Sequence, residues 1–286
     1  MDKLNRILAC IDASIYANSV VDHACWAAAR VTAAIEVLHV IQRNDAVQAR
    51  TDLSGAVGLG AKSALLEELA RIDESAGKAA QHQGRVLLDA ARDHIVAAGH
   101  LPPTITHRHG GIVETIVDRE READIVVIGK RGASADFAKG HLGSKVERVI
   151  RQSNKPVLVA SRAFREPTSV VVAYDGGKSS RIALSFTAGE PLFAGLGLHV
   201  IMAGKDDVEN RRHMDDARAK VGERTSSSFT LVDGKPEQVI GDQLIRHGSE
   251  MLVMGAYGHS PLRSMFVGST TSEMIRLCTV PVLLFR

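Results

Sequence analysis

Cysteine, aromatic residues and long apolar runs are all scarce in this chain of 286 residues. The three cysteines, Cys10, Cys25 and Cys278, are an odd number without Cys-x-x-Cys spacing, which argues against a disulfide framework and fits a reducing compartment. No apolar run approaches the roughly 20 residues that a membrane-spanning helix needs. The basic residues near Met1 are followed by no long apolar core, so no signal peptide is expected. We therefore predict a cytoplasmic protein that does not interact with a membrane.

An excess of one charge sign is also missing. The 35 Lys and Arg residues nearly balance the 33 Asp and Glu residues, which leaves a formal net charge of +2. A broad basic surface for nucleic acid is therefore not expected. The 12 histidines stand at no spacing typical of metal ligands, so we predict no metal site. The 45% hydrophobic content is that of an ordinary globular protein.

What the chain does contain is one pattern written twice. Ala123–Ala160 and Ser249–Phe285 both run from an apolar strand into Gly-x-x-Gly, a loop, Gly-Ser, a helical stretch and a Pro-Val strand. Each copy ends its own half, and the length suffices for two domains of ordinary size. We predict domains at residues 1–162, with a helical insertion around 45–98, and at 168–286. The boundary falls in the polar segment RAFREPT.

Each half contains five short apolar strands separated by helical stretches. Such a series predicts an α/β fold, with one doubly wound, five-stranded parallel sheet per half. The ligand crevice of such a sheet lies beyond the carboxyl ends of the strands, where the strand order reverses. The residues expected at those ends are Asp12, Val40 and Gly129 in the first half and Asp175, Val200 and Gly255 in the second.

The Gly-x-x-Gly turn and the Gly-Ser pair in each copy suggest a phosphate-binding site. Two glycines in a Gly-x-x-Gly turn let a ligand approach the backbone closely. Gly-Ser at a helix start adds unpaired N–H donors and the positive end of the helix dipole, which together favour a phosphate. A lone Gly-x-x-Gly is usually only a turn, and a serine there can simply cap its helix. The candidate residues are Gly129, Gly132, Gly143 and Ser144 in the first half and Gly255, Gly258, Gly268 and Ser269 in the second.

Gly255-x-x-Gly258, nine residues and then Gly268-Ser269 resemble the ATP-binding signature of the universal stress protein family. The strand ending in Asp, the Leu-His-Val strand, the Gly234–Pro236 turn and the terminal PVLLF are similar to that family too. The resemblance covers the whole chain as two tandem copies, apart from residues 54–84. It implies Rossmann-like domains, similar to adenine nucleotide alpha hydrolases, that pair through their final strands as an intramolecular pseudo-dimer. A homodimer of whole chains is compatible with it.

The same resemblance implies ATP as the ligand, with or without Mg²⁺. Asp175 would contact the adenine or the ribose, and the backbone near Val200 would line the base pocket. The ribose and phosphates would be held by Gly255, Gly258, Gly268, Ser269 and Thr270. The matching first-half positions are Asp12, Val40, Gly129, Gly132, Gly143 and Ser144.

The first copy departs from this pattern. Ten residues separate Gly132 from Gly143, one more than in the second copy. A bulge near Lys139–Gly140 would absorb the extra residue and leave Gly143-Ser144 in place. Otherwise the extra residue would move the phosphate site at Gly143-Ser144 out of register. Lys130 beside the turn offers a charge that would compensate. We expect nucleotide binding chiefly in the second half.

Three functions are open at this point. The favoured one is a stress-response sensor or regulator that binds ATP and hydrolyses it slowly at most, because the signature supplies no evident general base or Mg²⁺ carboxylate. A weak ATPase or phosphotransferase acting through Asp12 or Asp175 is the second. The third is a scaffold that binds no nucleotide.

Overall fold

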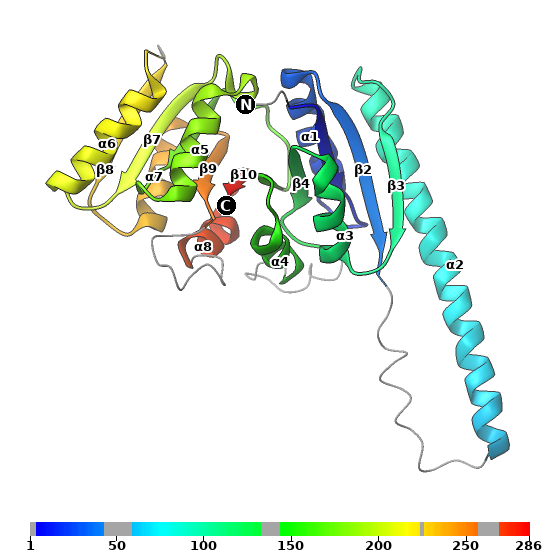
Figure 1. Ribbon diagram of the computed structural model, residues 1–286. Coiled ribbons are helices and arrows are strands. Elements are labelled where there is room, and N and C mark those ends of the chain that lie inside the picture. Colours follow the sequence, from blue (N-terminus) through cyan, green and yellow to red (C-terminus); the bar gives the residue numbers. More distant parts are fainter. Residues whose placement is uncertain (1–3, 43–58, 133–143, 224–225, 257–268) are drawn as a thin grey trace.

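The computed structural model describes residues 4–42, 59–132, 144–223, 226–256 and 269–286. Its strands form one ten-stranded sheet in the order β3-β2-β1-β4-β5-β10-β9-β6-β7-β8 (Figure 1). Neighbouring strands are parallel except for β5 and β10, so two parallel five-stranded sheets are joined edge to edge. The predicted fold class is thereby confirmed. The strands are β1 Arg6–Cys10, β2 Ala34–Ile41, β3 Thr104–His109, β4 Ile125–Gly129, β5 Val157–Ala160, β6 Ser169–Ala173, β7 Gly197–Ala203, β8 Ser227–Val232, β9 Met251–Gly255 and β10 Val282–Phe285.

Helices cover both faces of this sheet. One apolar core lies under α1 (Ala17–Val31), α2 (Leu59–Ala97), α5 (Lys178–Gly189) and α6 (Val208–Val221). The other lies under α3 (Ile112–Arg119), α4 (Ser144–Gln152), α7 (Pro236–His247) and α8 (Ser269–Leu277). Two short 3-10 turns, η2 (Glu120–Glu122) and η4 (Pro191–Phe193), complete the described elements. None of the described helices is long and apolar enough to cross a bilayer.

The insertion forms one long helix. The sequence left open whether a single helix or a pair of helices follows the glycine-rich segment, and α2 is a single helix of 39 residues. Its C-terminal part packs on the sheet through Leu88, Ala91 and Ile95, while its N-terminal part extends beyond the body of the molecule (Figure 1).

The amino-acid pattern explains the order of the strands. The inner strands β4 (IVVIG) and β9 (MLVMG) are continuously apolar, and every residue before the final glycine is buried because helices cover both sides. The outermost strands, β3 (TITHRH) and β8 (SSFTLV), are more polar and more exposed. Polar side chains suit these positions because an exposed apolar edge strand would promote aggregation.

The two halves meet at β5 and β10. These strands run antiparallel with Leu158 opposite Leu283, Val157 opposite Leu284 and Val159 opposite Val282. Leu158 and Leu283 hold the same place in the repeat, so an approximate two-fold axis passes through this pair. The predicted pseudo-dimer through the final strands is confirmed.

A second link between the halves lies on the face covered by α1. The guanidinium of Arg30 donates to the backbone oxygen of Leu192 at 2.5 Å and to that of Ala194. Side chains of both halves also share one apolar core on this face. The halves therefore pack as a single body.

A buried ion pair lies on the outer strands of the first half. Glu36 on β2 is 1% exposed and accepts two bonds from the guanidinium of Arg119, at 2.9 and 3.0 Å. The hydroxyl of Thr106 donates to the same carboxylate at 2.8 Å. Burial alone would raise the pKa of Glu36, but these bonds and the charges of Arg119 and Arg6 outweigh it and hold the pKa below its usual value.

Candidate functional site

The predicted aspartates and glycine turns come together at one edge of each half-sheet. Asp12 follows β1 closely and Gly129 ends the neighbouring strand β4. In the same way, Asp175 follows β6 and Gly255 ends its neighbour β9. In each half the strand order reverses between these two strands, which is where a doubly wound sheet places its ligand crevice.

In the first half, the aspartate lies against the glycine turn. A Cβ atom added at Gly132 would lie 3.0 Å from Oδ2 of Asp12. The other carboxylate oxygen accepts the backbone N–H of Ser14 at 3.1 Å, which holds Asp12 at the turn before α1. Gly129 has a packing reason of its own, because a Cβ atom there would lie 2.8 Å from the Cβ atom of Tyr16. The absence of a side chain at Gly129 therefore lets the start of α1 approach β4.

The second half has the same close approach between strand and helix. A Cβ atom at Gly255 would lie 2.9 Å from the backbone nitrogen of Ser180, in the first turn of α5. Backbone atoms cannot move aside as a flexible side chain can, so the position requires glycine. The amino end of α5, where the helix dipole is positive, is thereby held against the glycine turn.

Hydrogen bonds fix the orientation of Asp175. Its Oδ1 atom accepts the backbone N–H of Gly177 at 2.9 Å and the hydroxyl of Ser180 at 2.5 Å. These bonds form the turn that leads into α5, which is an ordinary role for aspartate at a helix start. The residue is exposed, and these bonds hold its carboxylate in one orientation at the end of the strand.

Val200 does not lie where the Leu-His-Val pattern predicted. It pairs with Val172 in the middle of β7, is fully buried, and is followed by three more strand residues up to Ala203. Val40 lies one residue before the end of β2, opposite Arg108. The expectation that Val200 ends its strand is therefore wrong.

The hydrogen bonds of the sheet show which residues correspond instead. Ile11, one residue before Asp12, donates its N–H to the backbone oxygen of Leu38. Tyr174, one residue before Asp175, donates in the same way to Ile201. Leu38 thus matches Ile201, and Val40 matches Ala203, three residues beyond Val200. Either register buries an apolar residue at every inner position, so the sequence pattern could not distinguish them.

Helix α6 contributes two residues that the sequence did not indicate. Gly176, with φ of 75°, lies against the ring of His213, and a Cβ atom there would be 2.7 Å from Cε1. Gly204, directly after β7, lies against the side-chain amide of Asn210. A Cβ atom added at Gly204 would be 2.9 Å from Nδ2 of Asn210. Among the described residues the Nδ1 atom of His213 is buried without a hydrogen-bond partner. The sequence feature that could have indicated these residues is the glycine after each strand, Gly176 and Gly204, because a residue without a side chain lets a helix pack closely.

Lys130 binds the other half rather than a ligand at its own glycine turn. Its ammonium donates to the backbone oxygens of Arg276 at 2.8 Å and Cys278 at 2.9 Å, at the carboxyl end of α8 in the other half. Burial lowers the pKa of Lys130 below its usual value. The expectation that the charge of Lys130 supports a phosphate site in the first half is therefore wrong.

The Gly-Ser positions begin helices as predicted. Ser144 is the first residue of α4, and Ser269 is the first residue of α8, followed by the half-buried Thr270. The hydroxyl of Thr271 donates to the backbone oxygens of Gly255 and Ala256, both at 3.3 Å, which ties the start of α8 to the glycine turn. Gly143, Gly258 and Gly268 lie outside the described residues. Within the described part of the chain, no three His, Cys, Asp or Glu residues are grouped as a metal site.

Comparisons with known proteins agree on one family. The model of the universal stress protein family matches residues 3–161 and 198–286, so Asp175 lies between the two matched segments. The chain is 34% identical over 288 residues to universal stress protein Slr1230 of Synechocystis sp., which covers 99% of this chain and 100% of that protein. It is 26% identical over 196 residues to universal stress protein Rv2005c of Mycobacterium tuberculosis, which covers 61% of this chain and 65% of that protein.

Solved structures share the fold over the full length. A universal stress protein from Archaeoglobus fulgidus superposes with a TM-score of 0.70 at 22% identity, covering 99% of this chain and 96% of that one. A putative universal stress protein from Pseudomonas aeruginosa gives a TM-score of 0.63 at 15% identity, covering 99% and 93%. At this level of identity the likeness concerns the fold alone.

Proposed function

The chain belongs to the universal stress protein family, and on this premise we propose that it binds ATP, chiefly in its second half, as a sensor or regulator of the stress response. The observation that carries the proposal is the arrangement around Gly255. There the strand end, Asp175 and the starts of α5 and α8 meet, with no room for a side chain between strand and helix.

Each part has a chemical role in this proposal. The fixed carboxylate of Asp175 accepts hydrogen bonds from the ribose hydroxyls or the adenine amino group. Ala203 and Gly204, rather than Val200, line the base pocket, and α6 closes over it with Asn210 and His213. The N–H groups at Ser269 and Thr270 face the phosphates with the positive end of the α8 dipole. Gly258 and Gly268 complete the cradle, and Mg²⁺ accompanies the phosphates where it is present.

The first half takes part less or not at all. Its loop between Gly132 and Gly143 is one residue longer. The extra residue would displace the N–H groups at Gly143 and Ser144 from the place that their counterparts take in the second half. Asp12, Val40, Gly129, Gly132, Gly143 and Ser144 are therefore proposed as a weaker site of the same kind.

Equilibrium dialysis of the full chain with ATP tests this function. We expect one molecule bound per chain. Gly268→Val should abolish most of this binding, because the added side chain would occupy the phosphate cradle, whereas the matched first-half variant Gly143→Val should leave it nearly unchanged. An absence of binding, or equal losses in the two variants, would contradict the proposal.

A slow ATPase or phosphotransferase is the second candidate. Asp175 is the acidic residue that this reaction would use, yet its Oδ1 atom is already engaged by Gly177 and Ser180. We therefore propose binding rather than turnover. Steady-state phosphate release that disappears in Asp175→Ala while ATP binding persists would favour the enzyme instead.

The predicted domains and assembly belong to this proposal as well. We place the first domain at residues 1–162, with the insertion at 45–98, and the second at 168–286. Both are proposed to act in the cytoplasm without nucleic acid or membrane partners. A homodimer of whole chains would appear as a doubled mass in size-exclusion chromatography with light scattering.

A further inference from the structure

We propose that Lys130 is a positioning residue for the nucleotide site of the second half, and that it acts through α8. The glycine turn of one half would then control the affinity of the other. This inference rests on the proposed function and extends it, because Lys130 lies in the turn of the half that binds less.

The first observation concerns the carboxyl end of α8. The last carbonyl groups of a helix have no partner within the helix and carry the negative end of its dipole. Lys130 donates to two of these groups, at Arg276 and Cys278, from across the boundary between the halves. A cation at this position stabilises the helix and fixes where its end lies.

The second observation concerns the opposite end of the same helix. Thr271, in the first turn of α8, donates its hydroxyl to the backbone oxygens of Gly255 and Ala256. Helix α8 has nine residues, which corresponds to a length of about 13 Å. A short rigid helix therefore connects the turn of the first half to the turn of the second, and its amino end supplies the N–H groups proposed for the phosphates.

The third observation is that the residues at the positions of Lys130 and Thr271 in the other copy cannot make the same side-chain contacts. In the second copy, Ala256 holds the place of Lys130 and has no group to donate. In the first copy, Val146 holds the place of Thr271 and is buried in the apolar core. Helix α4 therefore has no counterpart of the Lys130 and Thr271 contacts that hold α8. The two helices nevertheless lie at the same end of the sheet (Figure 1).

These contacts lead to a coupling between Lys130 and the nucleotide. ATP would favour the placement of α8 in which its first N–H groups face the phosphates. Lys130 favours a placement through the last carbonyl groups of the same helix. Two interactions that stabilise one arrangement strengthen each other, and by linkage the effect is reciprocal.

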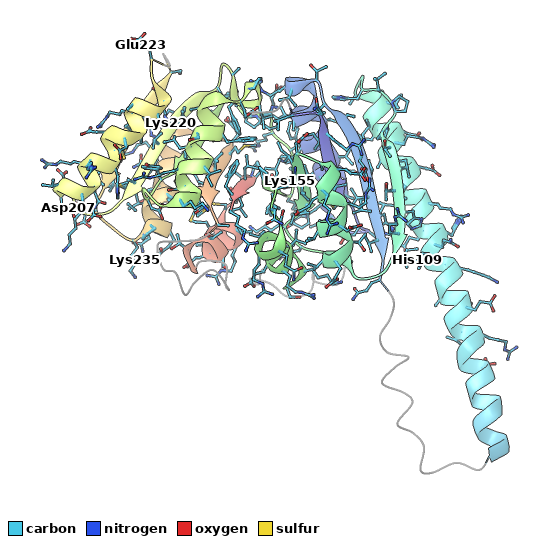
Figure 2. All side chains as sticks on the ribbon, viewed as in Figure 1. His109, Lys155, Asp207, Lys220, Glu223 and Lys235 are labelled. Atoms are coloured by element: carbon cyan, nitrogen blue, oxygen red, sulfur yellow. The ribbon has the colours of Figure 1, made fainter. Side chains whose placement is uncertain are left out.

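ATP affinity of full-length variants tests the inference from one side. We expect Lys130→Ala to weaken binding by roughly fivefold or more, with the melting temperature showing that the chain stays folded. Lys130→Arg should restore most of the affinity, since a guanidinium also donates to helix carbonyls. Lys220→Ala is the matched control, because Lys220 is an exposed lysine on α6 (Figure 2). Unchanged affinity in Lys130→Ala would overturn the inference.

Amine acetylation of the unmodified protein tests it from the other side. Mass spectrometry should show that saturating ATP slows the acetylation of Lys130 and leaves that of Lys220 unchanged. This protection should disappear in Gly268→Val, which separates an effect through the second-half site from direct contact with ATP. Equal rates for Lys130 with and without ATP would overturn the inference, as would protection that persists in Gly268→Val.

A wild-type chain that binds no ATP would overturn both this inference and the proposed function, whereas normal binding in Lys130→Ala would overturn the inference alone.

Discussion

At Gly255 there is no room for a side chain between β9 and α5. We expect Gly255→Ala to lower the free energy of unfolding by about 1–3 kcal/mol, because the added methyl group would press on the backbone of α5. ATP binding should weaken with it. Urea denaturation measures the stability change. Gly241→Ala is the control, since nothing lies within 4 Å of that position in α7 and alanine favours a helix. A loss no larger than that of the control would contradict the expectation.

The buried pair of Glu36 and Arg119 gives a second residue-scale prediction. Arg119→Met should destabilise the chain by up to about 3–5 kcal/mol, because the buried carboxylate of Glu36 loses its two shortest ionic bonds and keeps only Arg6, at 3.5 Å. Arg148→Met removes an Arg–Glu pair with Glu114 that has a single contact at 2.8 Å between two exposed side chains, so the cost should stay below about 1 kcal/mol. Chemical denaturation of the two variants compares them. Equal costs would show that burial of Glu36 does not matter.

The sequence predicted the strand-end position of some candidate residues correctly and that of others incorrectly. Asp12, Asp175, Gly129 and Gly255 could be located at strand ends because each follows an apolar run directly. Val200 could not, since strand register depends on pairing with a neighbour that is distant in sequence. His213 and Asn210 were missed for a related reason, because their relevance arises only when α6 folds over the strand ends.

At the scale of elements, α2 is docked by a small part of its length. Ile95 is fully buried, whereas the next residue, Val96, is 46% exposed. Ile95→Ala should therefore cost about 2–5 kcal/mol of unfolding free energy. Val96→Ala is the matched control and should change the free energy by less than about 0.5 kcal/mol. Thermal and urea denaturation would show the difference, and equal effects would mean that α2 contributes little through this face.

The strands and helices themselves were predictable to within a few residues. Continuous apolar runs mark the inner strands, because both faces of the sheet are covered. The insertion was harder, since its alanine-rich and charged sequence suits a helix without indicating whether it breaks. The described part of that segment is a continuous helix, which the absence of proline between Leu59 and Ala97 permits.

At the scale of the whole molecule, one buried and two partly buried histidines predict sensitivity to acid. Burial lowers the pKa of His23, His39 and His107 in the folded chain. The unfolded chain then binds protons more readily, so the stability from these neutral imidazoles is complete above about pH 6.5 and declines as the pH falls below it. The melting temperature should drop between pH 7.5 and about pH 5.5.

A pair of variants identifies the source of this pH dependence. His39→Phe should flatten the profile, because it removes one titrating group that is neutral in the folded state. His82→Gln should leave it unchanged, since His82 is exposed on α2. Parallel profiles for the wild type and His39→Phe would assign the acid sensitivity to other groups.

The paired arrangement of the halves was predictable from the repeat together with the resemblance to the family. Two copies of one fold, each ending in an apolar strand, leave two edges that are most simply covered by each other. The sequence did not predict how unequal the copies have become. The sequence drew attention to Lys130 but assigned it to its own turn, because its contacts with α8 arise only when the halves pack together.

Strands β5 and β10 belong to one chain, which changes how the two halves meet. The connection from Ala160 to Ser169 holds them at an effective concentration on the order of millimolar, so their association does not weaken when the protein is diluted. In an assembly of two identical chains, every substitution at such an interface would occur on both sides at once. Here a substitution changes one side alone. One copy is therefore free to lose a ligand and to gain a residue such as Lys130 that serves the other.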